Sequence, residues 1–402
     1  MSIINNITFH PHPKINNTIK DKIISMNTLK KMQTLSDSAQ YDLCDYVNRN
    51  RTSNANLPGI YHATGANGCK IPLFKTLMTN KCVNDCKYCI NQSKRNFTRL
   101  ELNPEELAKV FLYYYNNNYV NGLFLSSGVA KDVNETMENM LEALKILRKD
   151  YGYYDYIHLK IIPGASKDSI KRAMNLSDRV SLNIEAATSN GLSEISSTKD
   201  YNKDILKRLD WINEIFKTKK VGINNDSMAC TSQTTQMIVG ANDESDEEIL
   251  KRVKSLYKKI NLHRSYFSAF SPVEGTDFEK KEECNKIRTN QLYHADALLN
   301  LYKFDTEELV FQEDGHLSLD EDPKILAAKN MDIFPLEINK APFYELIRVP
   351  GIGTISGKRI IAIRKKQPFK KMEDLKKLGV VVDRAEPYIK LGGNYQTALD
   401  NY

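Results

Sequence analysis

Three of the seven cysteines in this 402-residue chain stand within eight positions, in the segment Cys82-Val83-Asn84-Asp85-Cys86-Lys87-Tyr88-Cys89. Three residues separate the first two cysteines, and two residues separate the last two. Loops this short let one stretch of chain bring three thiolates to an iron–sulfur cluster, which is only a few ångströms across. Three ligands leave one iron of a [4Fe-4S] cluster open for a further molecule. The segment therefore predicts that Cys82, Cys86 and Cys89 hold such a cluster.

Two other interpretations of the segment stay open on the residues alone: a structural zinc site and three unrelated buried thiols. Zinc normally takes four protein ligands. The nearest further cysteine, Cys69, stands at the opposite end of the preceding predicted strand. The cysteines outside the segment are too irregularly spaced to predict a second cluster, and buried free cysteine is common; they are Cys44, Cys69, Cys230 and Cys284.

Six short apolar stretches alternate with longer amphipathic helical stretches between residues 70 and 304; the predicted strands are 71–78, 122–126, 156–162, 180–185, 236–239 and 265–270. Helix starts are marked by Asn103-Pro104-Glu105-Glu106 and by the capping box Ser245-Asp246-Glu247-Glu248. Repeated βα units predict an α/β fold with a parallel sheet, here a partial (β/α)6 TIM-like barrel. The cysteine segment follows the first strand, at the mouth where barrels keep their chemistry.

Polar side chains recur on one face of two predicted strands. His158 and Lys160 alternate with apolar residues in the third strand, and Asn183 and Glu185 do so in the fourth. Polar groups on neighbouring strands of one parallel sheet indicate a polar barrel interior. We therefore expect a ligand cavity there.

Apolar residues make up 41% of the chain and charged residues 27%, which is ordinary globular usage. The apolar runs are far shorter than the roughly 18 to 20 residues that span a bilayer. The first 34 residues lack the apolar core of a secretory signal. The short apolar runs predict no membrane segment. Because the cysteines fit reduced thiolates better than disulfides, the sequence also predicts a cytoplasmic protein.

The net charge of +7 is concentrated near the C-terminus, where residues 335–393 carry thirteen Lys and Arg against six Asp and Glu. This excess of seven equals the net charge of the whole chain. A concentrated basic segment is where a polyanion would dock. The pattern divides the chain into an N-terminal extension (1–60), the barrel (61–304), a connector (305–334), a basic all-α domain (335–393) and a tail (394–402).

A helical hairpin is predicted in the basic segment, because Val349-Pro350-Gly351-Ile352-Gly353 interrupts two helical stretches at 341–348 and 354–366. Two glycines two positions apart allow a tight turn, and its amide groups with the next helix N-terminus can bind a phosphate. Gly351, Ile352 and Gly353 are therefore predicted to contact nucleic acid, with added contacts from Lys358 and Arg359 that carry no sequence information. A less complete second half follows at 369–380. An ordinary turn between helices and a protein-docking module stay open.

The cysteine spacing with an aromatic before the last cysteine resembles the radical S-adenosylmethionine (SAM) superfamily. The resemblance implies a [4Fe-4S] cluster that cleaves SAM to a 5′-deoxyadenosyl radical, with Tyr88 near the adenine. Later segments are similar to the superfamily's SAM-binding strand ends; they are Ser126-Ser127-Gly128, Asn183 with Glu185, and Gln236, Ile238 and Gly240 of Gln236-Met237-Ile238-Val239-Gly240. Two departures are that the first of these lacks the superfamily's acid and that Gln236 replaces a glycine.

Both halves together resemble radical SAM proteins that carry a C-terminal helix-hairpin-helix and are assigned to DNA modification or repair. Matching segments extend from about Tyr41 to Gly393. The resemblance implies an enzyme acting on DNA, an electron donor such as flavodoxin or ferredoxin, and a uracil-DNA-glycosylase-like partner. It names no residue that acts on the substrate, although Cys230 could donate hydrogen to a product radical. The alternatives are the same chemistry on RNA, radical chemistry on a small molecule with the hairpin docking a protein, and a non-catalytic DNA-binding protein with a structural metal.

Overall fold

The computed structural model of the protein describes residues 26–39, 57–64, 69–220 and 229–392. They group into two compact units, Met1–Asp243 with Lys258–Cys284 and Glu244–Tyr257 with Asn285–Tyr402. The predictions for Cys44 and for the tail 394–402 fall outside the described residues. The five-part division of the sequence stays a prediction. Within the described ranges, every helix is too short or too polar to cross a bilayer.

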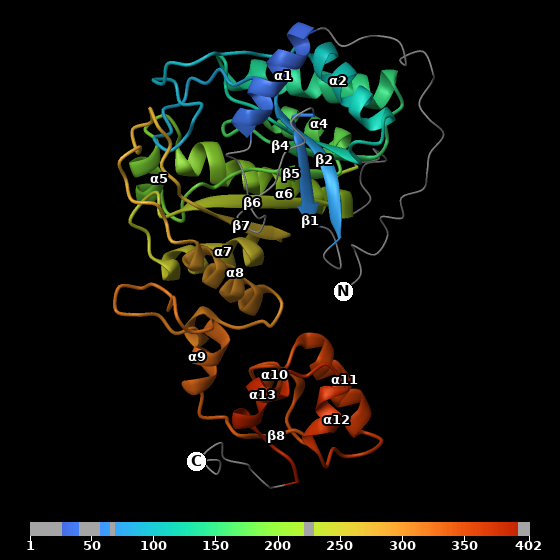
Figure 1. Ribbon diagram of the computed structural model, residues 1–402, viewed down its shortest axis with the longest axis vertical. Coiled ribbons are helices and arrows are strands. Elements are labelled where there is room, and N and C mark those ends of the chain that lie inside the picture. Colours follow the sequence, from blue (N-terminus) through green and yellow to red (C-terminus); the bar gives the residue numbers. More distant parts are fainter. Residues whose placement is uncertain (1–25, 40–56, 65–68, 221–228, 393–402) are drawn as a thin grey trace. The chain divides into compact units, whose positions relative to one another are not determined.

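The first unit contains a curved seven-stranded sheet with its strands in chain order (Figure 1). The strands are β1 Ile60–Thr64, β2 Lys70–Leu77, β3 Gly122–Ser126, β4 Tyr156–Lys160, β5 Arg179–Ser181, β6 Ser232–Val239 and β7 Arg264–Ala269. Strands β2 to β7 run parallel, and β1 pairs antiparallel with β2. The predicted α/β fold with six parallel strands in a partial barrel is therefore confirmed.

Several strands differ from the prediction: β6 begins at Ser232 rather than at residue 236, and β4 ends at Lys160 rather than at residue 162. Strand β1 was not expected, because its five residues stand alone before any βα repeat. Strand β5 ends at Ser181 rather than at residue 185. The amides of Leu182 and Ile184 still donate to carbonyls of β6, and the left-handed φ of 65° at Glu185 then ends the extended backbone.

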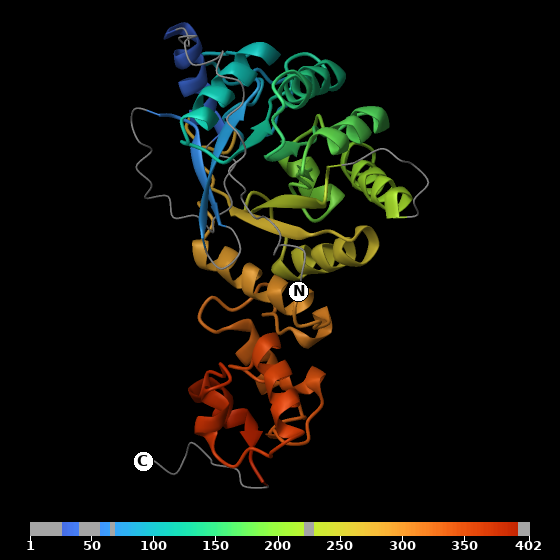
Figure 2. The ribbon, with the colours of Figure 1, turned by 90° about the vertical axis from the view of Figure 1, so that its right-hand side faces the viewer.

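The two faces of the sheet carry different side chains. Phe74 of β2 packs against Phe111 and Tyr114 of helix α2 (Pro104–Asn116), so this face meets the outer helices. The next residue, Lys75, points to the opposite face. Figure 2 shows the helices of this unit along one side of the sheet; they are α1 Met26–Ala39, α2, α3 Val133–Lys145, η3 Ile146–Asp150, α4 Lys167–Leu176, α5 Ser189–Ile195, η4 Tyr201–Leu206 and α6 Lys207–Lys220.

The helix starts follow the capping residues of the sequence. Asn103 accepts a hydrogen bond from the amide of Glu106, whose carboxylate accepts from the amide of Asn103, so the capping box of α2 is complete. In the second unit Ser245 and Glu248 form the same reciprocal pair before α7 (Asp246–Ile260). Both predicted starts are confirmed.

The second unit is mainly helical. It contains most of α7, then α8 Lys286–Asn300, η5 Thr306–Glu308, α9 Pro323–Lys329, α10 Phe343–Leu346, α11 Thr354–Arg364, α12 Met372–Lys376, α13 Val382–Ala385 and η6 Glu386–Tyr388. A short parallel pair, β8 Leu336–Glu337 and β9 Ile389–Lys390, joins the two ends of the otherwise helical segment predicted as the basic domain. Buried apolar residues from both helical hairpins, including Leu346, Ile360, Leu375 and Ala385, form one core.

Candidate functional site

The cysteine loop leaves the carboxyl end of β2 and runs beside the loop that follows β3. The Val83 amide donates to the carbonyl of Val129 at 2.8 Å, and the Gly128 amide donates to the carbonyl of Thr79 at 2.8 Å. A Cβ on Gly128 would lie 2.4 Å from the Lys81 carbonyl oxygen, closer than real contacts allow. Glycine is therefore required where the predicted Ser126-Ser127-Gly128 segment meets the cysteine loop.

The three cysteines lie together as free thiols, with Cys86 buried and Cys82 and Cys89 partly exposed. Burial raises the pKa of Cys86, and burial followed by the charge of Cys86 raises the pKa of Cys89 to about 12. Thiols in such surroundings need a positive partner before they ionise.

This donor set fits an iron–sulfur cluster. In the described part of the chain, no three His, Cys, Asp or Glu side chains converge closely enough to hold one metal ion. A cubane needs no such convergence, because each thiolate binds a different iron. Three neighbouring thiols on one loop therefore provide what a [4Fe-4S] cluster requires.

A buried polar network connects the cysteine loop to the end of β5. The Tyr88 hydroxyl donates to Glu185 Oε2 at 2.8 Å, and Lys199 Nζ lies 3.4 Å from Glu185 Oε1. The positive charge of Lys199 also acts on the buried Cys86 thiol. Burial lowers the pKa of Lys199, but the charges of Cys86 and Glu185 outweigh this effect and raise it. The structure thus joins two predicted cofactor residues and one predicted cluster ligand through a lysine that the sequence did not predict.

The segments after β5 and in β6 lie side by side. The Glu185 amide donates to the Gln236 carbonyl at 3.0 Å, and the Ile238 amide donates to the Glu185 carbonyl at 2.9 Å. Asn183 lies two residues before Glu185 and is partly exposed. Gly240 has a φ of 81°, and a Cβ there would lie 2.7 Å from the Cβ of Cys284. The predicted SAM-contacting residues of these two segments are therefore neighbours at the carboxyl edge of the sheet.

Polar and aromatic side chains fill the inner face of the sheet. The rings of Phe124 and His158 stack with centroids 4.1 Å apart, and His158 Nε2 lies 2.9 Å from Ser181 Oγ. Lys75 Nζ lies 4.9 Å from the centroid of the Phe124 ring. The predicted polar barrel interior is confirmed, because these side chains come from four neighbouring strands.

The hairpin turn between α10 and α11 is held by the chain itself. Gly351 has a φ of 82°, and a Cβ there would lie 2.3 Å from the Val381 carbonyl oxygen. Ile352 is buried, and its carbonyl accepts a hydrogen bond from Lys324 Nζ at 2.7 Å. The Gly353 amide donates to Ser356 Oγ at 2.8 Å. The turn is thus held by contacts within the chain, and the Ile352 side chain contributes to the core.

The basic side chains predicted on the second helix of the hairpin have different roles. Lys358 is exposed on α11. Arg359 is also exposed, yet its Nη1 donates to the Leu378 carbonyl at 3.1 Å and ties α11 to the second hairpin. That second half is present as α12 and α13, with Gly379 at a φ of 86° between them. Lys358 is therefore the cleaner probe of phosphate binding.

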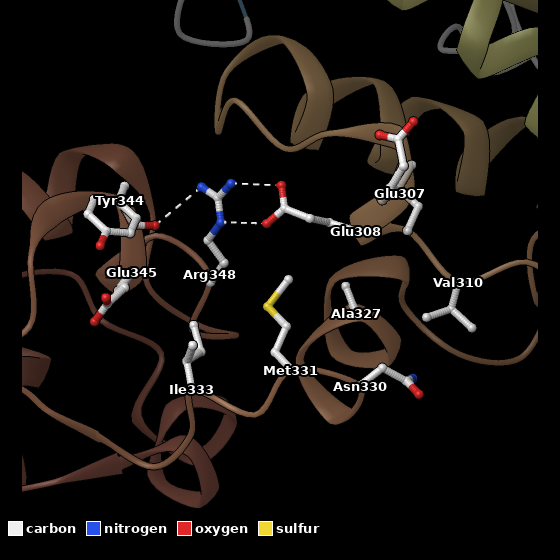
Figure 3. Close-up of a pocket in the computed structure, with 11 residues that line it drawn as sticks. Glu307, Glu308, Val310, Ala327, Asn330, Met331, Ile333, Tyr344, Glu345 and Arg348 are labelled. Carbon is white, nitrogen blue, oxygen red and sulfur yellow. Dashed lines mark hydrogen bonds and ion pairs between the residues drawn. The ribbon is translucent and has the colours of Figure 1, made fainter.

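A cavity of about 570 Å³ lies within the second unit, between η5, the end of α9 and α10 (Figure 3). Arg348 crosses it and donates two hydrogen bonds to Glu308, at 2.9 and 2.8 Å. The other lining side chains include the acids Glu307 and Glu345 and the apolar residue Met331. None of the predicted site residues lines this cavity, and its acidic wall is unsuited to nucleic acid.

Two protein-family models match this chain, one over the sheet-containing part and one over the C-terminal hairpins. Residues 76–256 match the Radical SAM superfamily model, and residues 335–382 match the helix-hairpin-helix motif model. No curated protein matches the sequence significantly. The match to the superfamily covers the cysteine loop and every predicted SAM-contacting residue.

Solved structures with a similar fold are more distant. HydG, a maturase of the [FeFe]-hydrogenase, is 16% identical with a TM-score of 0.45, over 56% of this chain and 49% of that chain. HydG from Carboxydothermus hydrogenoformans is 15% identical with a TM-score of 0.44, over 56% and 51%. Methylornithine synthase (PylB) is 12% identical with a TM-score of 0.45, over 70% and 74%. The chain thus spans about half the length of the two maturases.

Proposed function

From the premise that this chain is a radical SAM enzyme with a helix-hairpin-helix motif, we propose that its substrate is a nucleic acid, in a reaction of DNA modification or repair. The observation that carries the proposal is the presence in one chain of the Cys82, Cys86 and Cys89 loop and a basic double hairpin. Radical SAM enzymes bind a [4Fe-4S] cluster and SAM. When bound, the cluster supplies the electron that cleaves SAM and begins radical chemistry.

The chain's own residues have separate tasks in this proposal. The three thiols of the loop hold the cluster. Glu185 and Tyr88, already bonded to each other, present a fixed polar edge to SAM, and Asn183 adds a partly exposed amide. In this proposal, carbonyl and hydroxyl groups of Ser126, Ser127 and Gly128 make the contacts to the methionine end that an acid makes in the superfamily.

The edge of β6 completes the SAM site in this proposal. Gln236 and Ile238 are hydrogen-bonded to the Glu185 backbone, so their position is coupled to that of the carboxylate. Gly240 leaves room at the end of this strand for the Cys284 side chain. A planar adenine can approach an edge of this kind closely.

The hairpin module would bring the nucleic acid to the enzyme. Lys358, Lys365 and Lys366 are exposed on or directly after α11, where they can neutralise phosphates. A base inside a duplex must then leave the stack, or the substrate must be single-stranded. RNA remains an alternative substrate, because phosphate contacts do not exclude it.

Two observations favour a second candidate function. The hairpin turn is braced by Lys324, and a cavity with an acidic wall lies beside α10. Both features suit a module that docks a protein while the barrel acts on a small molecule.

The partners that we propose for the full enzyme are an electron donor, such as flavodoxin or ferredoxin, and a glycosylase-like protein. We propose that the enzyme works in the reducing cytoplasm.

The test is an anaerobic incubation of the reconstituted protein with SAM, dithionite and defined DNA or RNA oligonucleotides, followed by mass spectrometry of the nucleosides. We expect a new nucleoside from DNA and none with the Cys86→Ala variant. Modification of RNA alone would reassign the substrate. SAM cleavage with no change in either polymer would favour the small-molecule alternative, and a colourless protein would favour the non-catalytic one.

A further inference from the structure

Asp85 lies between two of the proposed cluster ligands and accepts hydrogen bonds from a distant stretch of chain. Its carboxylate receives the hydroxyls of Ser196 at 2.7 Å and Thr198 at 3.0 Å, together with the hydroxyl and amide of Ser197. The Asp85 amide in turn donates to Thr198 Oγ1 at 3.4 Å. Residues 196–198 thus fold around one side chain of the cysteine loop.

The backbone adds a second tie between the same two segments. The Lys87 amide donates to the Ile195 carbonyl at 2.9 Å, on the far side of Asp85 from the first cysteine. The stretch from 195 to 198 is therefore bonded to the cysteine loop along its length. We call these bonds, from Asp85 and Lys87 to residues 195–198, the clamp.

Lys199 follows the clamp directly and is the residue that it positions. Its side chain is 9% exposed and that of Glu185 is 6% exposed. The ammonium pairs with Glu185 at 3.4 Å, and its charge acts on the neighbouring Cys86 thiol. Burying a flexible lysine costs side-chain entropy, and the clamp already fixes the backbone that precedes it.

We propose that Asp85 is a positioning residue that, through the clamp, holds the Lys199 ammonium against Cys86 as a fixed positive charge beside the cluster. The inference rests on the proposed function, in which Cys82, Cys86 and Cys89 hold the cluster. It adds Asp85 and Lys199 as residues that act on the cluster without binding it. A positive charge in a buried site stabilises the more negative, reduced form of a cluster, because the potential depends on net charge and on hydrogen bonds to sulfur. The clamp fixes the distance at which this charge acts.

The experiment measures the midpoint potential of the reconstituted cluster by dye-mediated titration, followed by EPR. Lys199→Met should make the potential more negative, whereas Lys199→Arg should keep most of the wild-type value. Asp85→Asn should shift the potential in the same direction by a smaller amount. The matched control is Lys203→Met, which removes an exposed lysine four positions along the chain.

A double-mutant cycle tests whether Asp85 acts through Lys199. If it does, Asp85→Asn should shift the potential little further in the Lys199→Met background. A full additional shift there, or an unchanged potential in Lys199→Met, would overturn the proposal. If Lys199→Met loses its iron, retention of iron in Lys199→Arg supports the charge role, and equal loss in both variants contradicts it. A wild-type protein without a cluster would instead refute the proposed function.

Discussion

Beside the cysteine loop, Lys199 and Glu185 form a buried ion pair, whereas three lysines on or directly after α11 face water. Lys199 and Glu185 are less than a tenth exposed and contact each other, while Lys358, Lys365 and Lys366 are exposed. Buried charges act strongly over a few ångströms and are little screened, but exposed charges are screened beyond about 8 Å at physiological salt. Single residues should therefore decide whether the loop binds its cluster and SAM. The number of positive charges should decide how strongly α11 binds DNA.

The strongest test of the loop removes a proposed ligand. Cys82→Ala, Cys86→Ala and Cys89→Ala should each abolish stable cluster assembly, because the loop offers three thiols for three irons. Iron and sulfide content after anaerobic reconstitution measures the outcome. Cys69→Ala is the matched control, since Cys69 is exposed and lies before β2. Near-full iron in any of the three ligand variants would contradict the assignment.

A smaller loss is expected when the polar edge is changed and the thiols are kept. Glu185→Gln should retain the cluster and weaken SAM binding about 10- to 100-fold, which corresponds to roughly 1.5–3 kcal/mol for a hydrogen bond to a charged group. Calorimetry with SAM on the reconstituted protein gives the affinity. Glu194→Gln, on the exposed side of α5, serves as control. Unchanged SAM affinity in Glu185→Gln would remove Glu185 from the cofactor site.

The charges on α11 should behave differently. If the full-length protein engages about three to five phosphates, the log–log slope of DNA affinity against salt should be roughly −3 to −4.5. Lys358→Glu should lower the affinity for all sequences alike and flatten the slope by about one. SAM cleavage without DNA should stay at the wild-type rate. Binding that ignores salt would favour the protein-docking function for this module.

Arg359 offers a way to sharpen the comparison within α11 itself. Because its guanidinium also bonds the Leu378 carbonyl, Arg359→Glu should lower both DNA affinity and thermal stability. Lys358→Glu should lower affinity alone. Equal Tm values for the two variants would show that the bond to Leu378 contributes little. DNA affinity and Tm should therefore be measured on both proteins.

The sequence predicted the features that local patterns encode. The spacing of Cys82, Cys86 and Cys89, the capping boxes and the parallel strands all depend on residues close together in the chain. Lys199 was missed because it lies 110 positions after Cys89 in a short run without periodicity. Its role depends on the Asp85 contacts, which no spacing rule reveals. Lys324 was missed for the same reason, since its partner is a backbone carbonyl in another helix–turn segment.

The smallest expected effect concerns Lys324, a buried lysine on α9 in the second unit. It tests whether burial alone makes a single charge important, or whether the charge must lie beside the cysteine loop. Burial lowers the pKa of Lys324 to about 7, from an ordinary value of 10.5. Its Nζ donates to the Ile352 carbonyl and lies 4.5 Å from the centroid of the Tyr302 ring. Between about pH 7 and 10.5 the unfolded chain holds a proton that folded Lys324 tends to release. Stability from this group should therefore rise with pH in that window.

The measurement compares Tm at pH 7 and pH 9 for the wild type and Lys324→Met. Subtracting the Tm change of Lys324→Met from that of the wild type cancels the groups that titrate alike in both proteins. The remaining difference reports the titration of Lys324. One pKa unit is about 1.4 kcal/mol, so the wild type should gain a few degrees on Lys324→Met as the pH rises. Lys329→Met, an exposed lysine on the same helix, should show no such gain. If Lys324 instead stays charged in the folded protein, the Tm of the wild type and that of Lys324→Met will change with pH in parallel. Burial alone will then not explain why single charges matter more beside the cysteine loop.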